Sequence, residues 1–129
     1  MKSRLLALAA GAWLSMSLLS VRPASAHHAG TAFDNTRELT VAGTVKEFKW
    51  VNPHVWLYLM VPNEKGEMEE WQLEGGSISI LGRAGWSAKL LQAGDKITVT
   101  VTPLRSGENG GEFRTVVKAD GKSYGWGMP

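Results

Sequence analysis

ELTVAGTVKEFKW, residues 38–50, is the stretch that decides the fold of this chain. Apolar and polar side chains alternate in its first half, which is the pattern of a half-buried β-strand. The alternation then changes phase, because Phe48 and Trp50 carry the apolar signal on the opposite parity. A phase change beside an interior glycine predicts a bulge or a sharp coil between Gly43 and Phe48. A strand bent in this way can pair on two sides of a barrel.

Four further strand patterns follow the bent one, with one short helix among them. Asn52-Pro53 favours a corner after the first strand, because proline cannot donate a hydrogen bond to a sheet. Ser77 is the expected N-cap of the helix, and Gly85 is expected to end it. The later strands are predicted at residues 54–61, 69–74, 96–103 and 112–119, and the helix at 78–84.

This order of elements predicts a mainly β protein, a small five-stranded OB-like barrel. An OB-type barrel has its helix between strands three and four, which is where the pattern places residues 78–84. An open sandwich or roll is the alternative, because hydrophobic periodicity locates strands better than it fixes their topology.

The first residues have the three parts of a secretory signal peptide. Lys2 and Arg4 give a positive start, an uncharged apolar run follows, and small residues end at Ala26. We predict cleavage after Ala26 and a periplasmic or secreted mature protein without a membrane span. An uncleaved anchor is the alternative, for which the apolar run is short. The predicted divisions are a signal peptide at 1–26, an N-terminal arm at 27–37, the barrel at 38–122 and a C-terminal tail at 123–129.

Charge and composition exclude several classes of function. Three of the 14 basic residues lie in the predicted leader and all 12 acidic residues follow it, so the mature chain keeps 11 basic and 12 acidic side chains, a formal net charge of −1. Such a chain lacks the basic surface that binds nucleic acid or an anionic membrane. The sequence has no cysteine, which excludes disulfides, thiolate metal sites and cysteine nucleophiles.

The motifs that stand out are AHH at 26–28, GTVKEF at 43–48, WVNPHVW at 50–56, EGGS at 74–77, RAGW at 83–86 and GDKITV at 94–99. Together they resemble a family of small exported bacterial proteins, domain of unknown function 6152, over nearly the whole mature chain. The Asn-Pro-His segment flanked by tryptophans is the most specific part. The resemblance implies a bacterial, periplasmic protein with a small β-barrel domain, and it implies no established activity, substrate or catalytic residue.

The three histidines of the chain are candidate metal ligands: His27, His28 and His54. Cleavage after Ala26 frees an α-amine whose pKa is about 8, so part of it is unprotonated at neutral pH. That amine can chelate one metal ion together with Nδ1 of His27, or together with the next amide and His28. Nitrogen-rich sites of this kind suit Cu(II) best, with Ni(II) and Zn(II) behind it.

His54 has two readings in the sequence. It completes the metal site if the N-terminal arm folds back over the barrel. Alternatively, His54 is structural: it follows Pro53, hydrogen-bonds a turn carbonyl and orients the corner. In that reading His27 and His28 are simply solvated polar residues.

A second candidate site is an aromatic face at the corner and on the second strand, for a ligand or a partner: Trp50, Asn52, His54, Trp56 and Tyr58. OB barrels bind oligomeric ligands across their second and third strands, and aromatic platforms serve such binding. The alternative is that the helix, the arm or the tail with Trp126 covers this face, because large exposed apolar patches are rare.

No catalytic set is recognisable in the sequence. Ser77 lacks the flanking pattern of a nucleophile elbow, and Glu70 and Glu74 are not a glycosidase pair without a cleft to hold them. We therefore predict a non-enzymatic exported binding module that holds a metal ion, Cu(II) foremost, or a small envelope ligand. The alternative is an accessory protein that docks on an envelope partner through its aromatic face.

Overall fold

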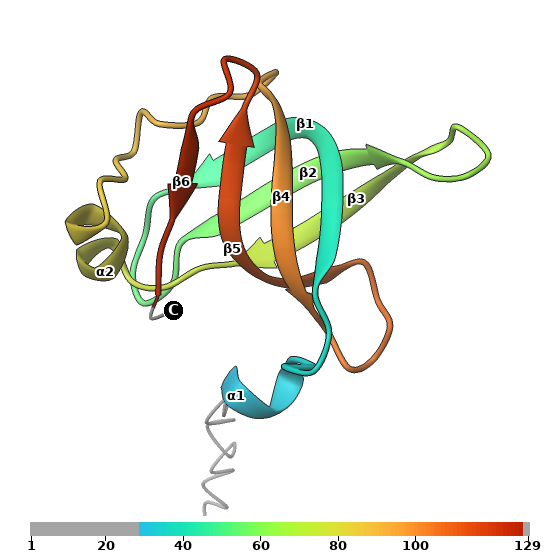
Figure 1. Ribbon diagram of the computed structural model, residues 1–129, viewed down its shortest axis with the longest axis horizontal. Helices are drawn as coiled ribbons and strands as arrows, with labels where there is room; N and C mark the ends of the chain where they lie inside the picture. The colour runs from blue at the N-terminus through green and yellow to red at the C-terminus, as the bar shows by residue number, and fades with distance from the viewer. Residues whose placement is uncertain (1–28, 128–129) are drawn as a thin grey trace, which may run out of the picture.

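The strands of the chain form one sheet that curls round on itself (Figure 1). The computed structural model describes residues 29–127, so the predicted signal peptide, His27 and His28 lie outside the described residues. The strands are β1 (Leu39–Lys49), β2 (Trp56–Pro62), β3 (Met68–Glu74), β4 (Lys96–Pro103), β5 (Gly110–Lys118) and β6 (Ser123–Gly125). The helices are α1 (Ala29–Ala32) and α2 (Ile78–Arg83). Within this described part of the chain, neither helix is long and apolar enough to cross a membrane.

Neighbouring strands follow the order β3-β2-β1-β4-β5-β6, and a parallel pairing of β3 with β5 closes the sheet. The first five strands therefore make a closed barrel, and α2 lies between β3 and β4 in the chain. This arrangement confirms the prediction of a mainly β, five-stranded OB-like barrel. The fourth strand, predicted at residues 96–103, coincides with β4.

The bend in β1 lets this strand pair with two neighbours. Its first half pairs with β4 and its second half with β2. The register with β2 shifts between Val45 and Glu47, which confirms the predicted bulge. A Cβ atom on Gly43 would lie 2.6 Å from the carbonyl oxygen of Met60. Glycine is therefore what lets β1 approach β2 so closely at the start of their pairing.

Alternating side chains of the strands fill the barrel. The core includes Val45, Leu57, Leu59, Leu73, Val99, Val101, Phe113 and Val116. Leu81 of α2 and Trp86 just after the helix are buried in the same core, which holds the helix against the barrel. The helix begins as predicted, because the Ser77 side chain accepts a hydrogen bond from the backbone N–H of Ile80 at 3.3 Å.

Parts of the segments predicted as arm and tail belong to the folded barrel. Phe33, in the predicted arm, is buried and forms a β-bridge with Leu104. Three residues of the predicted tail form β6, which pairs with β5. Both segments are too short to show a periodic pattern. Burial of one aromatic side chain and pairing with an existing strand hold them in place.

Candidate ligand-binding face

The outer side of β2 carries aromatic residues that the sequence singles out. Successive side chains of a strand point to opposite sides, so Leu57 and Leu59 fill the barrel while Trp56, Tyr58 and Met60 point outward. The Trp56 and Tyr58 rings are near parallel, with an interplanar angle of 28° and centroids 6.4 Å apart. Both side chains remain partly exposed.

Charged side chains from β1 and β3 border these rings. The Lys49 ammonium lies 5.0 Å from the centre of the Tyr58 ring, within reach of a cation–π contact. The Lys46 ammonium forms an ion pair and a hydrogen bond with the Glu70 carboxylate, across the intervening strand β2. That hydrogen bond is the main reason why the pKa of Glu70 is lowered and the pKa of Lys46 is raised. Both groups are therefore charged at neutral pH.

His54 lies at the corner before β2, and one side of its imidazole ring is held in place. Its Nδ1 atom is 2.9 Å from the carbonyl oxygen of Gly75 and 3.1 Å from Oε1 of Glu74. Since a carbonyl oxygen only accepts, Nδ1 carries a hydrogen, and Nε2 lies on the opposite side of the ring. The contact with Gly75 confirms the reading in which His54 bonds a turn carbonyl and orients the corner. The side chain is still 40% exposed.

The charged side chains beside β3, among them Glu70 and Glu74, are followed on β5 by another charged pair, Glu112 and Arg114. Glu112 lies opposite Glu74 in the parallel pairing, and its carboxylate is 2.5 Å from Nη2 of Arg114. Burial raises the pKa of Glu112, and Glu74 adds to the rise, while Arg114 and His54 oppose it. The Arg114 guanidinium also lies over the Trp126 ring, 5.5 Å from its centre. Each of these carboxylates therefore has a basic neighbour.

A polar hollow lies between β3 and the loop from β4 to β5. Its volume is about 290 Å³, and its lining is Glu70, Gln72, Leu104, Glu108, Asn109 and Gly110. The strand register places it next to the rings, because Tyr58 is opposite Gln72 and Gln72 is opposite Gly110. We call the combined surface the β2–β3 face, defined by Trp56, Tyr58, Met60, Gln72, Glu74 and the lining of this hollow.

The structure unites only part of the predicted aromatic site. Trp56 and Tyr58 share the β2–β3 face, and His54 lies at its end. Trp50 packs against the core instead, with its ring centre 5.9 Å from that of Phe48. The reason is the phase of β1, whose alternation carries Phe48 to the inside and Lys49 to the outside before the corner.

Asn52 and Trp126 also have roles away from this face. The Asn52 side-chain oxygen accepts a hydrogen bond from the backbone N–H of Ile78 at 3.2 Å, which adds a second cap to the first turn of α2. Trp126 belongs to the tail, one of the three segments named as an alternative cover for the aromatic face, and it packs edge-on against Phe113 at a centroid distance of 5.8 Å. The tail tryptophan therefore belongs to the core side of the barrel.

The metal hypothesis rests on residues that the structure describes only in part. His27 and His28 lie outside the described residues. Among residues 29–127, no group of three or more histidine, aspartate or glutamate side chains could hold a metal ion. The metal hypothesis therefore stays a prediction that depends on His27 and His28.

The polar members of the face were harder to find from the sequence. Gln72 could have been found from its parity on the third strand, because it alternates with the buried Leu73. Glu112 and Arg114 come next to β3 only through the parallel β3–β5 pairing. No local pattern indicates a pairing between such distant segments.

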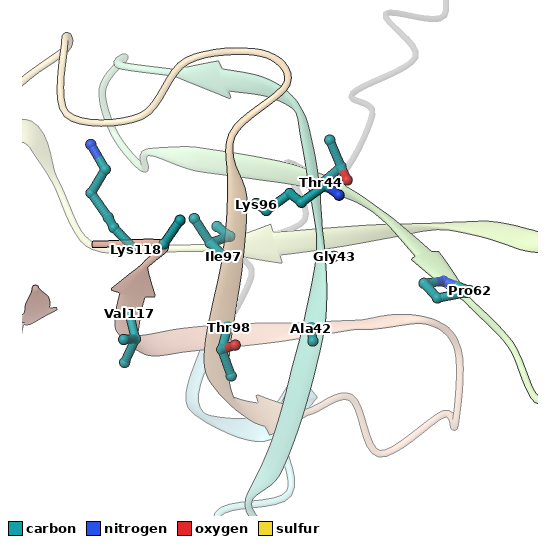
Figure 2. A pocket seen from close by; sticks show the side chains of 10 residues that line it. Ala42, Gly43, Thr44, Pro62, Lys96, Ile97, Thr98, Val117 and Lys118 are labelled. Carbon is teal, nitrogen blue, oxygen red and sulfur yellow. The ribbon is translucent and has the colours of Figure 1, made fainter. Parts of the chain in front are cut away.

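Another hollow lies on a different side of the barrel, over β1, β4 and β5 (Figure 2). Its volume is about 410 Å³, and small side chains such as Ala42 and Thr98 line much of it. Of its two lysines, Lys118 donates a hydrogen bond to the backbone oxygen of Leu90 at 2.8 Å, which ties it to the fold. None of the predicted site residues lines this hollow.

The fold and the β2–β3 face together define a small OB-like barrel with a candidate ligand site on its second and third strands. The family model described as "Family of unknown function (DUF6152)" matches residues 15–114, and the chain belongs to this family. The resemblance inferred from the sequence motifs is thereby confirmed. No curated protein and no solved structure matches the chain.

Proposed function

We propose that this protein is an exported, non-catalytic binding module that holds its ligand on the β2–β3 face. The observation that carries the proposal is the near-parallel Trp56–Tyr58 pair, which lies partly exposed on the outside of the barrel. Aromatic rings that a small domain leaves on its surface commonly mark a contact site. The position also corresponds to the strands on which OB barrels bind their ligands.

The charges of the face indicate the kind of ligand. On and beside it lie the carboxylates of Glu70, Glu74 and Glu112. Glu70 and Glu112 form ion pairs with Lys46 and Arg114, and Glu74 contacts the His54 ring. A nucleic acid needs a positively charged groove along its backbone. The face therefore favours a ligand without phosphate groups, such as a small envelope compound or a segment of an envelope protein.

Export is the second part of the proposal and rests on the leader at residues 1–26. Mass spectrometry of protein recovered from the periplasmic fraction of a bacterial host tests it. We expect a mature chain that begins at His27. Protein that stays in the cytoplasm with its leader attached contradicts this part of the proposal.

Nuclear magnetic resonance of the ¹⁵N-labelled mature protein tests the binding site directly. The probes are neutral oligosaccharides, short peptides of both charges and soluble lipid headgroups. We expect at least one class to shift the Trp56 indole and Gln72 amide resonances, and Trp56→Ala to abolish the effect. Ile80→Ala, on the exposed side of α2, serves as the matched control. Shifts confined to β4, β5 and β6, or no shift with any probe, contradict the proposal.

A second candidate function is metal binding at the mature N-terminus, with Cu(II) as the preferred ion. The freed amine, His27 and His28 would supply nitrogen ligands, which suit Cu(II). His54 supports the idea, because a histidine that donates through Nδ1 to a carbonyl or carboxylate is oriented to bind a metal through Nε2.

Electron paramagnetic resonance during a Cu(II) titration tests the metal candidate. The mature protein beginning at His27 should bind Cu(II) through several nitrogen atoms, and adding one residue before His27 should remove that signal. His54→Ala shows whether the corner histidine takes part. Binding no tighter than that of a free His-His peptide contradicts the metal candidate and leaves the β2–β3 face untouched.

A further inference from the structure

We propose that the ligand of the β2–β3 face is a neutral oligosaccharide, an inference that rests on the proposed binding function. The first reason is that rings and hollow adjoin in one surface. Tyr58, Gln72 and Gly110 lie side by side on three adjacent strands. The rings and the hollow therefore occupy neighbouring positions on the sheet.

The two parts of the face match the two kinds of surface that a sugar ring has. A pyranose has apolar C–H faces, which pack on aromatic rings. The Trp56 and Tyr58 rings are 28° from parallel, and both side chains are partly exposed, so the pair offers apolar ring surface to a sugar. Sugar hydroxyls both donate and accept, so they suit the amides of Gln72 and Asn109 and the carboxylate of Glu108 in the hollow.

The hollow depends on a glycine at the start of β5. A Cβ atom on Gly110 would lie 2.9 Å from the carbonyl oxygen of Gln72 and 2.9 Å from Cδ1 of Leu104. A larger residue would force the two strands or the Leu104 side chain apart. Glycine at position 110 therefore allows β5 to pair closely with β3 beside the hollow.

Charge favours a neutral ligand over either kind of ion. Three carboxylates on and beside the face have a basic neighbour, in the pairs Lys46–Glu70, His54–Glu74 and Arg114–Glu112, while Glu108 accepts a hydrogen bond from the Ser106 hydroxyl. An anionic ligand would meet these carboxylates, and a cationic ligand would have to displace their partners. A polyhydroxyl ligand needs neither, because it exchanges hydrogen bonds and apolar contacts. Its binding should therefore change little with ionic strength.

Isothermal titration calorimetry with hexasaccharides of glucose and of N-acetylglucosamine tests this inference on the mature protein. We expect at least one of them to bind at low and at high salt. Trp56→Ala should weaken binding by about tenfold or more. Gln72→Ala changes an exposed side chain, so it should keep the native circular dichroism spectrum and still weaken binding several-fold. Ile80→Ala should bind like the wild type.

The oligosaccharide inference and the binding function fail in different ways. If neither hexasaccharide binds but a peptide binds in a Trp56-dependent manner, the oligosaccharide inference is overturned and the proposed function stands. Hexasaccharide binding that both Trp56→Ala and Gln72→Ala leave intact also overturns it, because the sugar then lies elsewhere. If neither the wild type nor the folded Gln72→Ala variant binds a probe of any class, both the oligosaccharide inference and the proposed binding function are overturned.

Discussion

Two groups of aromatic side chains have opposite roles in this molecule. One group, which we call the closing cluster, packs where the barrel meets α2 and β6: Phe48, Trp50, Trp86, Phe113, Tyr124 and Trp126. There Trp86 is 3% exposed and Phe113 is fully buried, and each ring contacts another. The Trp56–Tyr58 pair has contacts within itself and with Lys49, and it stays partly exposed. Aromatic content alone therefore does not mark a binding site, because the neighbours of each ring decide its role.

Glycines make the closing cluster possible. A Cβ atom on Gly75 would lie 2.5 Å from Cζ of Phe113, and one on Gly76 would lie 2.9 Å from Cζ3 of Trp126. Both rings therefore rest directly on bare backbone. On β3, Trp56 lies opposite Glu74 and Tyr58 lies opposite Gln72. These neighbours are long polar side chains, so the two rings do not pack on bare backbone and remain on the surface.

The largest expected difference between the two groups is in stability. Phe113→Ala should lower the free energy of unfolding by about 3–5 kcal/mol, because it leaves a cavity in a fully buried site. Trp56→Ala should cost less than half as much, since its ring is partly exposed. Denaturant unfolding followed by circular dichroism measures both variants. Equal losses would break the distinction between the closing cluster and the ligand face.

Gly75→Ala should be next in size, because it tests the seat of the Phe113 ring. The added methyl group overpacks the cluster, and we expect a loss of about 1–3 kcal/mol. Gly82→Ala is the matched control, since nothing lies within 4 Å of its Cβ position in α2. That control should be neutral or stabilising by up to about 1 kcal/mol, as alanine favours helix more than glycine does. Denaturant midpoints that fall equally for both variants would contradict this account.

Asn52→Ala should cost about 1 kcal/mol of stability, the usual cost of removing a helix-capping side chain. Ligand binding at the β2–β3 face should not change, because Asn52 contacts α2. Asn52→Asp keeps the acceptor oxygen and should recover most of the stability. Thermal unfolding and the calorimetric titration separate the two roles. A loss of binding without a loss of stability in Asn52→Ala would mean that Asn52 contributes to the ligand site and not to the stability of α2.

Glu112→Gln should have the smallest effect, with the opposite sign. Burial raises the pKa of Glu112, so the folded protein takes up a proton at a higher pH than the unfolded chain, and the native carboxylate weakens the fold above its folded-state pKa. The glutamine variant should therefore be more stable at neutral pH, by less than about 1 kcal/mol. The gain should shrink as the pH falls toward the unfolded-state pKa. Unfolding at a series of pH values checks this.

A matched control for that pH series is Glu64→Gln in the hairpin loop, where the side chain is exposed. It should leave the pH dependence of stability as it is in the wild type. A stability gain in Glu112→Gln that stays constant from neutral to acidic pH would mean that the buried charge of Glu112 is not its cause.

Much of the barrel could be predicted because its signals are local. Clean alternation located β4, and the phase change after Gly43 located the bulge between Val45 and Glu47. Strand periodicity and glycine position are properties of a short window of sequence, so they can be recognised without knowing the fold. The role of His54 as a turn-orienting side chain was also readable, as one of two alternatives, from its place after Pro53.

Partners across the sheet could not be predicted in the same way. Trp50 and Trp56 flank one Asn-Pro-His motif, yet one packs on the core and the other points outward. The inside–outside alternation of a strand does not continue through a proline corner. The sequence therefore grouped Trp50 with Trp56 only because both flank the same motif. Glu112 joined the candidate site through the parallel β3–β5 pairing, which depends on the whole topology.

That parallel pairing also sets when the domain can become complete. β5 follows the other four barrel strands in the chain, and it is the neighbour of both β4 and β3. While the chain emerges from its N-terminal end, β3 keeps an open edge until β5 has appeared. The barrel therefore closes only when the last of its five strands is available. If the leader at residues 1–26 directs export of the unfolded chain, the barrel would close only after β5 has also crossed the membrane.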